Sequence, residues 1–198
     1  YRRGRDHALS ALDAARPGFR RALADPSAPL DLQPDEVALA YWAAAAWGGQ
    51  ISLSKDDPDT VADLPLAIRL ARLAWDADPA FGNGDLASLM GSFEVARPGG
   101  SRDRATGYFD EALRLAGGRS AGAFVAKAEG IAQPAGDKAA FIALLTGLVV
   151  VVTHAYQGAT LEDGVLIAAP VVLTLIGQPR AEWAPRRIPL GQIGRAHV

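Results

Sequence analysis

The spacing of apolar residues predicts a chain that is almost entirely helical up to about residue 145. In residues 5–16, the apolar side chains recur every three or four positions, which is the period of one helix face. Proline and glycine interrupt such stretches, and no stretch before residue 146 alternates with the period of two typical of a half-buried strand. We predict an all-α domain over residues 1–145, with helices at 5–16, 19–24, 34–48, 65–77, 85–96, 102–116 and 121–132 and a last one capped by Asp137.

A pattern of small residues repeats along this domain. The series Ala67, Ala71, Ala74, Pro79 recurs 38 residues later as Ala105, Phe109, Ala112, Gly117, and a weaker copy begins after another 34, at Ala139. A 34-residue period is that of tetratricopeptide (TPR) repeats. Small side chains let paired helices approach closely, and helical hairpins stack because they cannot bury their apolar faces singly. The predicted architecture is a TPR-like stack of antiparallel helical hairpins.

The chain changes character after residue 145. Residues 146–198 contain only seven charged residues in 53, and four consecutive valines at 149–152 favour an extended strand. We therefore predict an irregular or partly β tail over residues 146–198. Its closing sequence, QIGRAHV, looks like translated sequencing adapter. A frameshift, a chimera or adapter read-through would explain this tail, and a genuine short extension is the alternative.

Composition excludes several classes of protein. The chain has 198 residues, a formal charge of −2 and no cysteine. Nucleic-acid binding requires a concentrated basic surface, so the charge argues against it. Without cysteine, disulfides and cysteine-based metal sites are excluded. The apolar stretches at 141–152 and 165–176 are shorter than the roughly 20 residues of a membrane-spanning helix.

Motifs that suggest catalysis or metal binding are weak here. Ser52 and Lys55 fit the S-x-x-K pattern of penicillin-recognising enzymes, but the S-D-N and K-T-G elements that accompany it are absent. Residues 82–87 fit G-x-G-x-x-A, yet they follow a predicted helix where a dinucleotide site needs a strand. The aspartates at 56–59 lack the order of a calcium loop, and helix capping explains them. We predict a protein that is not an enzyme and has no cofactor or metal. The alternative, a hydrolase, requires the Lys55 amine to lie within hydrogen-bond reach of the Ser52 hydroxyl.

The aromatic residues of the segment YWAAAAWG, at 41–48, have two interpretations. At 100° per residue, Tyr41, Trp42 and Trp47 lie near 0°, about 100° and about 240° around a helix, so they do not share one face. They are either core packing or the wall of an aromatic pocket whose indole N–H and phenol groups are its polar contacts. Periodicity leaves both open.

Several stretches resemble the TatT family, the T component associated with TRAP transporters. The likeness covers about residues 1–145, and its most specific part is the aromatic segment together with ISLSKDDP at 51–58. It continues in ADLP at 62–65, FEVARPGG at 93–100, YFDEAL at 108–113 and LAGG at 115–118.

The resemblance implies a non-enzymatic, TPR-like periplasmic protein, anchored through a lipidated N-terminus that is missing from this chain. It implies a homotrimer that contacts the solute-binding P component of a TRAP uptake system and passes it a small hydrophobic or carboxylated solute. The alternative function is a TPR adaptor that binds a peptide in its concave groove. For a ligand pocket we expect Tyr41, Trp42, Trp47, Ser52 and Lys55, with Asn83, Glu94 and Arg97 as secondary candidates.

Overall fold

The computed structural model describes residues 1–155, and within that range the chain is helical with no β-strand. The long helices are α1 (Arg2–Ala15), α3 (Val37–Leu53), α5 (Leu64–Ala77), α6 (Asp85–Ala96), α7 (Arg102–Leu115) and α10 (Lys138–Ala155). Shorter elements connect them: α2 (Phe19–Ala24), η1 (Pro34–Glu36), α4 (Pro58–Ala62), η2 (Phe81–Gly84), α8 (Ala121–Lys127), the π-helical turn η3 (Ala128–Ala132) and α9 (Gln133–Ala135). The prediction of an all-α fold is confirmed.

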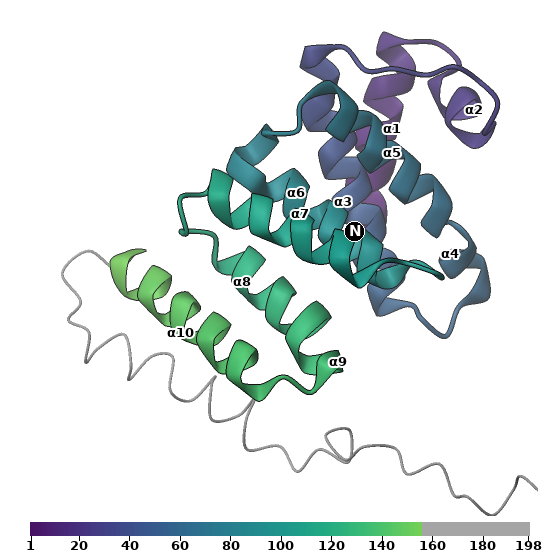
Figure 1. Ribbon diagram of the computed structural model, residues 1–198. Helices are drawn as coiled ribbons and strands as arrows, with labels where there is room; N and C mark the ends of the chain where they lie inside the picture. The colour runs from purple at the N-terminus through teal and green to yellow at the C-terminus, as the bar shows by residue number, and fades with distance from the viewer. Residues whose placement is uncertain (156–198) are drawn as a thin grey trace, which may run out of the picture.

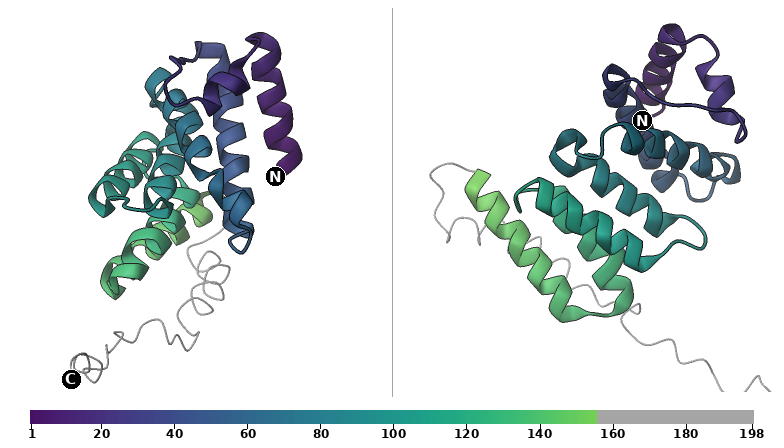
Figure 2. Two further views of the ribbon diagram at one scale, coloured as in Figure 1. Left: turned by 90° about the vertical axis from the view of Figure 1, so that its right-hand side faces the viewer. Right: turned by 45° about the horizontal axis from the view of Figure 1, so that its top comes forward.

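The helices pack side by side in chain order. Figure 1 shows α1 and α2 at one end, α3, α5, α6 and α7 in the middle, and α8 with α10 at the other end. The tightest pairs are α1 with α3, α3 with α5, and α6 with α7. The two views of Figure 2 show the same succession from the N-terminal helices to α10. The result is an extended array in which each helix touches mainly its neighbours.

The core of the array is built on alanine where two helices approach most closely. On α5 the residues Ala67, Ala71 and Ala74 have no exposed surface, and neither have Ala105 and Ala112 on α7. This is the behaviour expected of the first two copies of the repeated pattern. The third copy behaves differently, because Ala139 is exposed. Its helix, α10, instead buries Phe141 and Leu145 against the segment that contains Ala128 and Ala132.

Several helical glycines lie directly against an aromatic ring from another part of the chain. A Cβ atom added to Gly48 of α3 would lie 2.9 Å from the ring of Phe93 in α6, and one added to Gly91 of α6 would lie 2.8 Å from Phe109 in α7. At the other end of the array, a Cβ atom added to Gly147 of α10 would lie 2.5 Å from the ring of Phe124. Real Cβ atoms do not approach other atoms so closely, so these contacts require glycine.

Two boundaries differ from the sequence prediction. We predicted that a helix ends near Gly48, but α3 continues to Leu53, because its glycines are covered by aromatic rings rather than left open to solvent. We also predicted an extended segment at 149–152, and this was wrong: those valines lie within α10. Packing of α10 against α8 and η3 outweighs the modest helix propensity of valine. The remainder of the predicted tail lies outside the described residues.

Candidate functional site

A pocket of about 200 Å³ opens between α1, α2, α3 and α5, and Trp47 forms part of its wall. Its apolar lining comes from Leu9, Leu23, Ala24 and Leu66 together with the indole ring. Its polar lining comes from Arg5, Asp6, Arg20 and Asp63. The pocket therefore combines aliphatic walls with charged groups of both signs.

Trp47 is fixed in this pocket by interactions on two sides. Its indole N–H donates a hydrogen bond of 3.1 Å to Oδ2 of Asp63, at the start of α5. The guanidinium carbon of Arg5 lies 5.1 Å from the centre of the indole ring, a cation–π distance. Only 6% of Trp47 is exposed, so the ring is part of the core as well as of the wall. The interpretation as core packing therefore applies to Trp47, and a role in holding a ligand stays a prediction.

The two arginines of the pocket differ in how their charges are balanced. Arg5 pairs with Asp6 at 2.9 Å and lies 3.7 Å from Asp63 Oδ2. Arg20 donates instead to two neutral groups, the backbone carbonyl of Asp6 at 2.9 Å and the hydroxyl of Ser10 at 2.7 Å. Its guanidinium forms no ion pair within residues 1–155, although its backbone N–H donates to Oδ1 of Asp13 at 3.1 Å. Arg20 thus brings a guanidinium without an ion-pair partner in the described residues to a pocket that Asp6 and Asp63 also line.

A second hollow, of about 470 Å³, lies between the start of α6 and the end of α7. Asn83 lines it and has a positive φ of 51°, between two glycines that also have positive φ. Its other polar side chains are those of Asp85, Arg119 and Ser120. Ser120 already uses its hydroxyl oxygen to accept the amide N–H of Ala123 as the cap of α8. This hollow is more polar than the Trp47 pocket and lies in a different part of the array.

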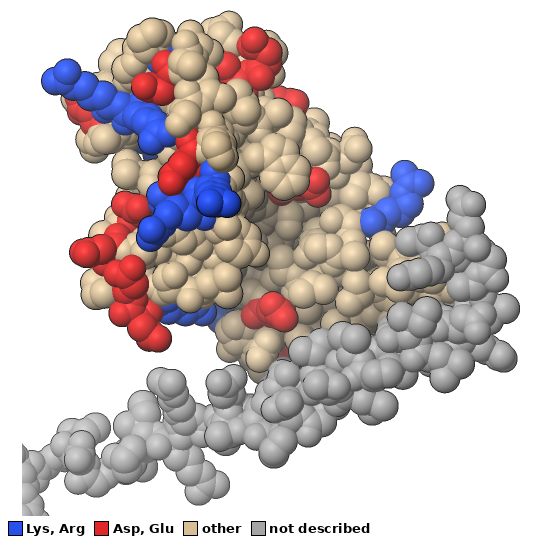
Figure 3. All heavy atoms as spheres, turned by 180° about the vertical axis from the view of Figure 1, so that it is seen from behind, with Lys and Arg blue, Asp and Glu red and all other residues tan. Residues whose placement is uncertain are grey.

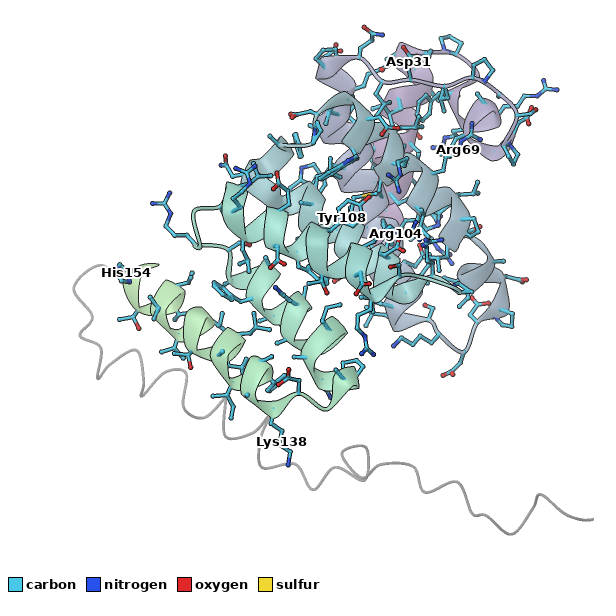
Figure 4. All side chains as sticks on the ribbon, in the orientation of Figure 1. Asp31, Arg69, Arg104, Tyr108, Lys138 and His154 are labelled. Atoms are coloured by element: carbon cyan, nitrogen blue, oxygen red, sulfur yellow. The ribbon has the colours of Figure 1, made fainter. Side chains whose placement is uncertain are left out.

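Glu94 and Arg97 belong to neither hollow. Glu94 is buried at the end of α6, where it accepts two hydrogen bonds from the Arg97 guanidinium, at 2.8 and 2.7 Å. It also accepts the backbone N–H of Ser101 at 2.7 Å and Nε of Arg104 at 3.1 Å. The hydrogen bonds from Arg97, reinforced by those of its other partners, lower the pKa of Glu94 from 4.5 to about 2. These residues form an ionic clamp, centred on the buried Glu94, that fixes the turn between α6 and α7. Figure 4 shows Arg104 on α7.

The remaining candidates lie on the surface. Ser52 is exposed and donates its hydroxyl to the carbonyl of Gly49 at 2.9 Å, and Lys55 is exposed in the turn after α3. The hydrolase alternative needs a hydrogen bond between these two side chains, and the structure does not have it. Asp57 of the same turn caps α4 by accepting the N–H of Asp59, as the capping interpretation requires. Among the residues described, no group of His, Asp and Glu is arranged to hold a metal ion.

Tyr41 and Trp42 point away from the Trp47 pocket. Trp42 is 63% exposed, and its ring lies 5.0 Å from that of Tyr41. Tyr41 is half-buried and also contacts Phe81, at 5.1 Å between ring centres. The eight predicted residues therefore separate into the Trp47 pocket, an aromatic cluster, the second hollow, the clamp and the exposed turn.

Comparison with known protein families shows which family this chain belongs to. The model of the TRAP transporter T-component family matches residues 1–163. This chain belongs to that family. The resemblance seen in the sequence is thereby confirmed, and the protein is associated with a TRAP transport system. No curated protein matches the chain.

None of the helices in residues 1–155 combines the length and the apolarity of a membrane span. Figure 3 shows one face of the array, where charged side chains gather towards one side and the centre carries few.

Sequence reasoning missed the polar partners of Trp47. Arg5 and Asp63 are far from it in the chain, so no motif links the three. One signal could have found Asp63: it lies in the segment at 62–65 that carries part of the family likeness.

Proposed function

We propose that this T component is a periplasmic, TPR-like scaffold of a TRAP uptake system that also holds a small carboxylated solute in its Trp47 pocket. Family membership supports the association with the transporter. The observation that carries the solute-binding part is the guanidinium of Arg20, which forms no ion pair within residues 1–155 and lies beside aliphatic walls. A carboxylate would supply the missing charge, and a short apolar tail would fit against the leucines.

The same proposal covers the partners of the protein. The solute-binding P component would receive the solute, and the T component would act as a homotrimer tethered to the membrane by a lipidated segment preceding Tyr1. The all-helical array supports a scaffold, because stacked hairpins offer a long surface without further elements. Co-purification of a solute-binding P component with this chain tests the scaffold role, and a mass measurement of the free protein tests the trimer.

Solute binding is tested by ¹⁹F NMR on protein labelled with 5-fluorotryptophan. The resonance of Trp47 is assigned by its loss in Trp47→Phe, and the labelled protein is then titrated with straight-chain monocarboxylates and with the alcohols of equal length. We expect carboxylates to shift the Trp47 resonance saturably and the alcohols to shift it much less, because only the carboxylate pairs with Arg20.

The matched variants are Arg20→Gln and Arg21→Gln. Both residues lie on α2 and are exposed, but only Arg20 lines the pocket. A charged hydrogen bond contributes about 1.5 kcal/mol or more, so Arg20→Gln should weaken binding roughly tenfold. Arg21→Gln should bind as the wild type does. If no solute moves the Trp47 resonance, the protein is a scaffold without this binding role.

A further inference from the structure

The aromatic cluster on the other side of α3 is separate from the Trp47 pocket. It consists of Trp42, Tyr41 and Phe81, and Phe81 reaches it from the η2 segment before α6. Trp42 and Trp47 are five positions apart on one helix, which places them about 140° apart around its axis. A ligand at one of them does not touch the other.

The three rings are tilted relative to one another, unlike a flat stack. The Trp42 and Tyr41 rings meet at 69° with centres 5.0 Å apart, and the Tyr41 and Phe81 rings meet at 49° with centres 5.1 Å apart. Tilted rings turn their faces in different directions and so form a corner. The π face of an aromatic ring is its negative part, and indole has the strongest attraction for a cation.

Trp42 is left largely open in this corner. Its exposed fraction is 63%, whereas Trp47 has 6%. Trp47 already has the Arg5 guanidinium over its ring, but no arginine or lysine of residues 1–155 lies over Trp42 at cation–π distance. Contact between a large indole and water is unfavourable, and the cost in free energy grows with the apolar area that stays exposed. The exposed ring face is therefore available to a ligand.

A carboxylate accompanies the rings. Asp85 begins α6, four residues after Phe81, and is exposed. It is close enough to Tyr41 to act on its phenol: burial raises the pKa of Tyr41, and the negative charge of Asp85 raises it further. Within residues 1–155 the Asp85 carboxylate forms no ion pair, although Arg119 lines the same hollow. The three rings and Asp85, which follows Phe81 by four residues, thus bring π faces and a carboxylate without an ion pair in residues 1–155 to the same end of α6.

We propose that Trp42, Tyr41, Phe81 and Asp85 bind a small organic cation of the quaternary ammonium class. Methyl groups of such a cation contact ring faces, and its spread positive charge interacts with the rings and with the carboxylate. A primary ammonium ion is more strongly hydrated and would lose more on leaving water. The site selects for charge and apolar surface together, which neither an alkane nor a metal ion offers.

The test uses choline and its neutral isostere, 3,3-dimethylbutan-1-ol, on the full chain labelled with 5-fluorotryptophan. The resonance of Trp42 is assigned with Trp42→Phe, and ionic strength is held constant with sodium chloride. We expect choline to shift the Trp42 resonance saturably and to leave Trp47 unmoved, with the isostere binding at least about tenfold more weakly.

Two aspartate variants separate the role of the carboxylate from helix stability. Asp85 and Asp103 both lie in the first turn of a long helix and are exposed, but Asp103 has no aromatic cluster beside it. Asp85→Asn should weaken choline binding about fivefold, whereas Asp103→Asn should leave it unchanged. Circular dichroism of each variant checks that the helices remain folded.

Other outcomes overturn the proposal. Equal shifts from choline and the isostere would make the corner an apolar patch without preference for cations. Equal losses of affinity in the two aspartate variants would show that the Asp85 carboxylate takes no part in binding. If the Trp42 resonance shows no saturable shift up to roughly 100 mM choline, the site does not exist. The carboxylate titration reports on Trp47 and the choline titration on Trp42, so each of the two proposals can fail without the other.

Discussion

Glu94 offers the sharpest test of how the array is held together. Its carboxylate is 5% exposed and receives hydrogen bonds from Arg97, Ser101 and Arg104. The substitution Glu94→Gln keeps the shape of the side chain but removes its charge, so two guanidinium groups lose their counter-ion. We expect the turn between α6 and α7 to loosen and the free energy of unfolding to fall.

The size of the effect follows from the pKa of Glu94. The pKa falls from 4.5 to about 2 on folding, and this difference corresponds to at most about 3 kcal/mol. Solvent reaches Arg104, whose side chain is 61% exposed, and screens part of the interaction. We therefore expect a loss of about 2 kcal/mol at pH 7. Because the folded pKa is the lower one, the contribution is complete above about pH 5 and disappears as the pH falls from 4.5 towards 2.

Urea unfolding at a series of pH values, followed by circular dichroism, measures this difference between wild type and variant. The matched control is Glu111→Gln, which breaks an exposed pair with Arg114 on the surface of α7. Water and salt screen such a pair, so that variant should unfold almost as the wild type does. The reasoning is refuted if Glu94→Gln lowers the free energy of unfolding as much at pH 3 as at pH 7. It is also refuted if Glu111→Gln lowers that free energy as much as Glu94→Gln does.

Two further predictions concern the backbone. Gly84→Ala should lower the free energy of unfolding by several kcal/mol, because φ is +101° and the new Cβ would lie 2.5 Å from the carbonyl oxygen of Ala112. Gly18→Ala should lower it by only about 1 kcal/mol, because Gly18 has φ +90° but lies in open space. Thermal unfolding of the two variants checks this, and equal losses would contradict the role of the contact. Arg69→Lys should lower the free energy of unfolding by about 1–2 kcal/mol, because Arg69 donates to three backbone carbonyls at and after the end of α2. Figure 4 shows Arg69 beside α2. The exposed Arg72→Lys is its control in urea unfolding, and a similar loss there would refute the bracing role.

Helices with local stop signals were predictable from the sequence. The predicted helix at 85–96 coincides with α6, because a left-handed glycine precedes it and Arg97-Pro98 follows it. Periodicity also predicted that Trp42 and Trp47 face different sides, and their exposures of 63% and 6% confirm it. These features depend only on residues close together in the chain.

The site needed contacts that no local pattern contains. Arg5, Trp47 and Asp63 meet from three helices, so their grouping depends on how α1, α3 and α5 pack. The prediction for the valines at 149–152 was wrong for the same reason. Their own preference for a strand is weak, and the packing of α10 against other helices decides their conformation. Glu94 was predicted as a secondary ligand residue from its place at a helix end, which cannot reveal that its oxygens are already occupied.

The rings that lie on glycines have a consequence for the geometry of the whole array. At Gly48, Gly91 and Gly147 an aromatic ring of another helix occupies the space that a side chain would fill. A methyl group at any of these points would lie less than 3.0 Å from the ring, so the ring or the helix that carries it has to move. Because each helix packs mainly on its neighbours, we expect one such substitution to change the relative placement of two successive parts of the array while the surface residues stay the same.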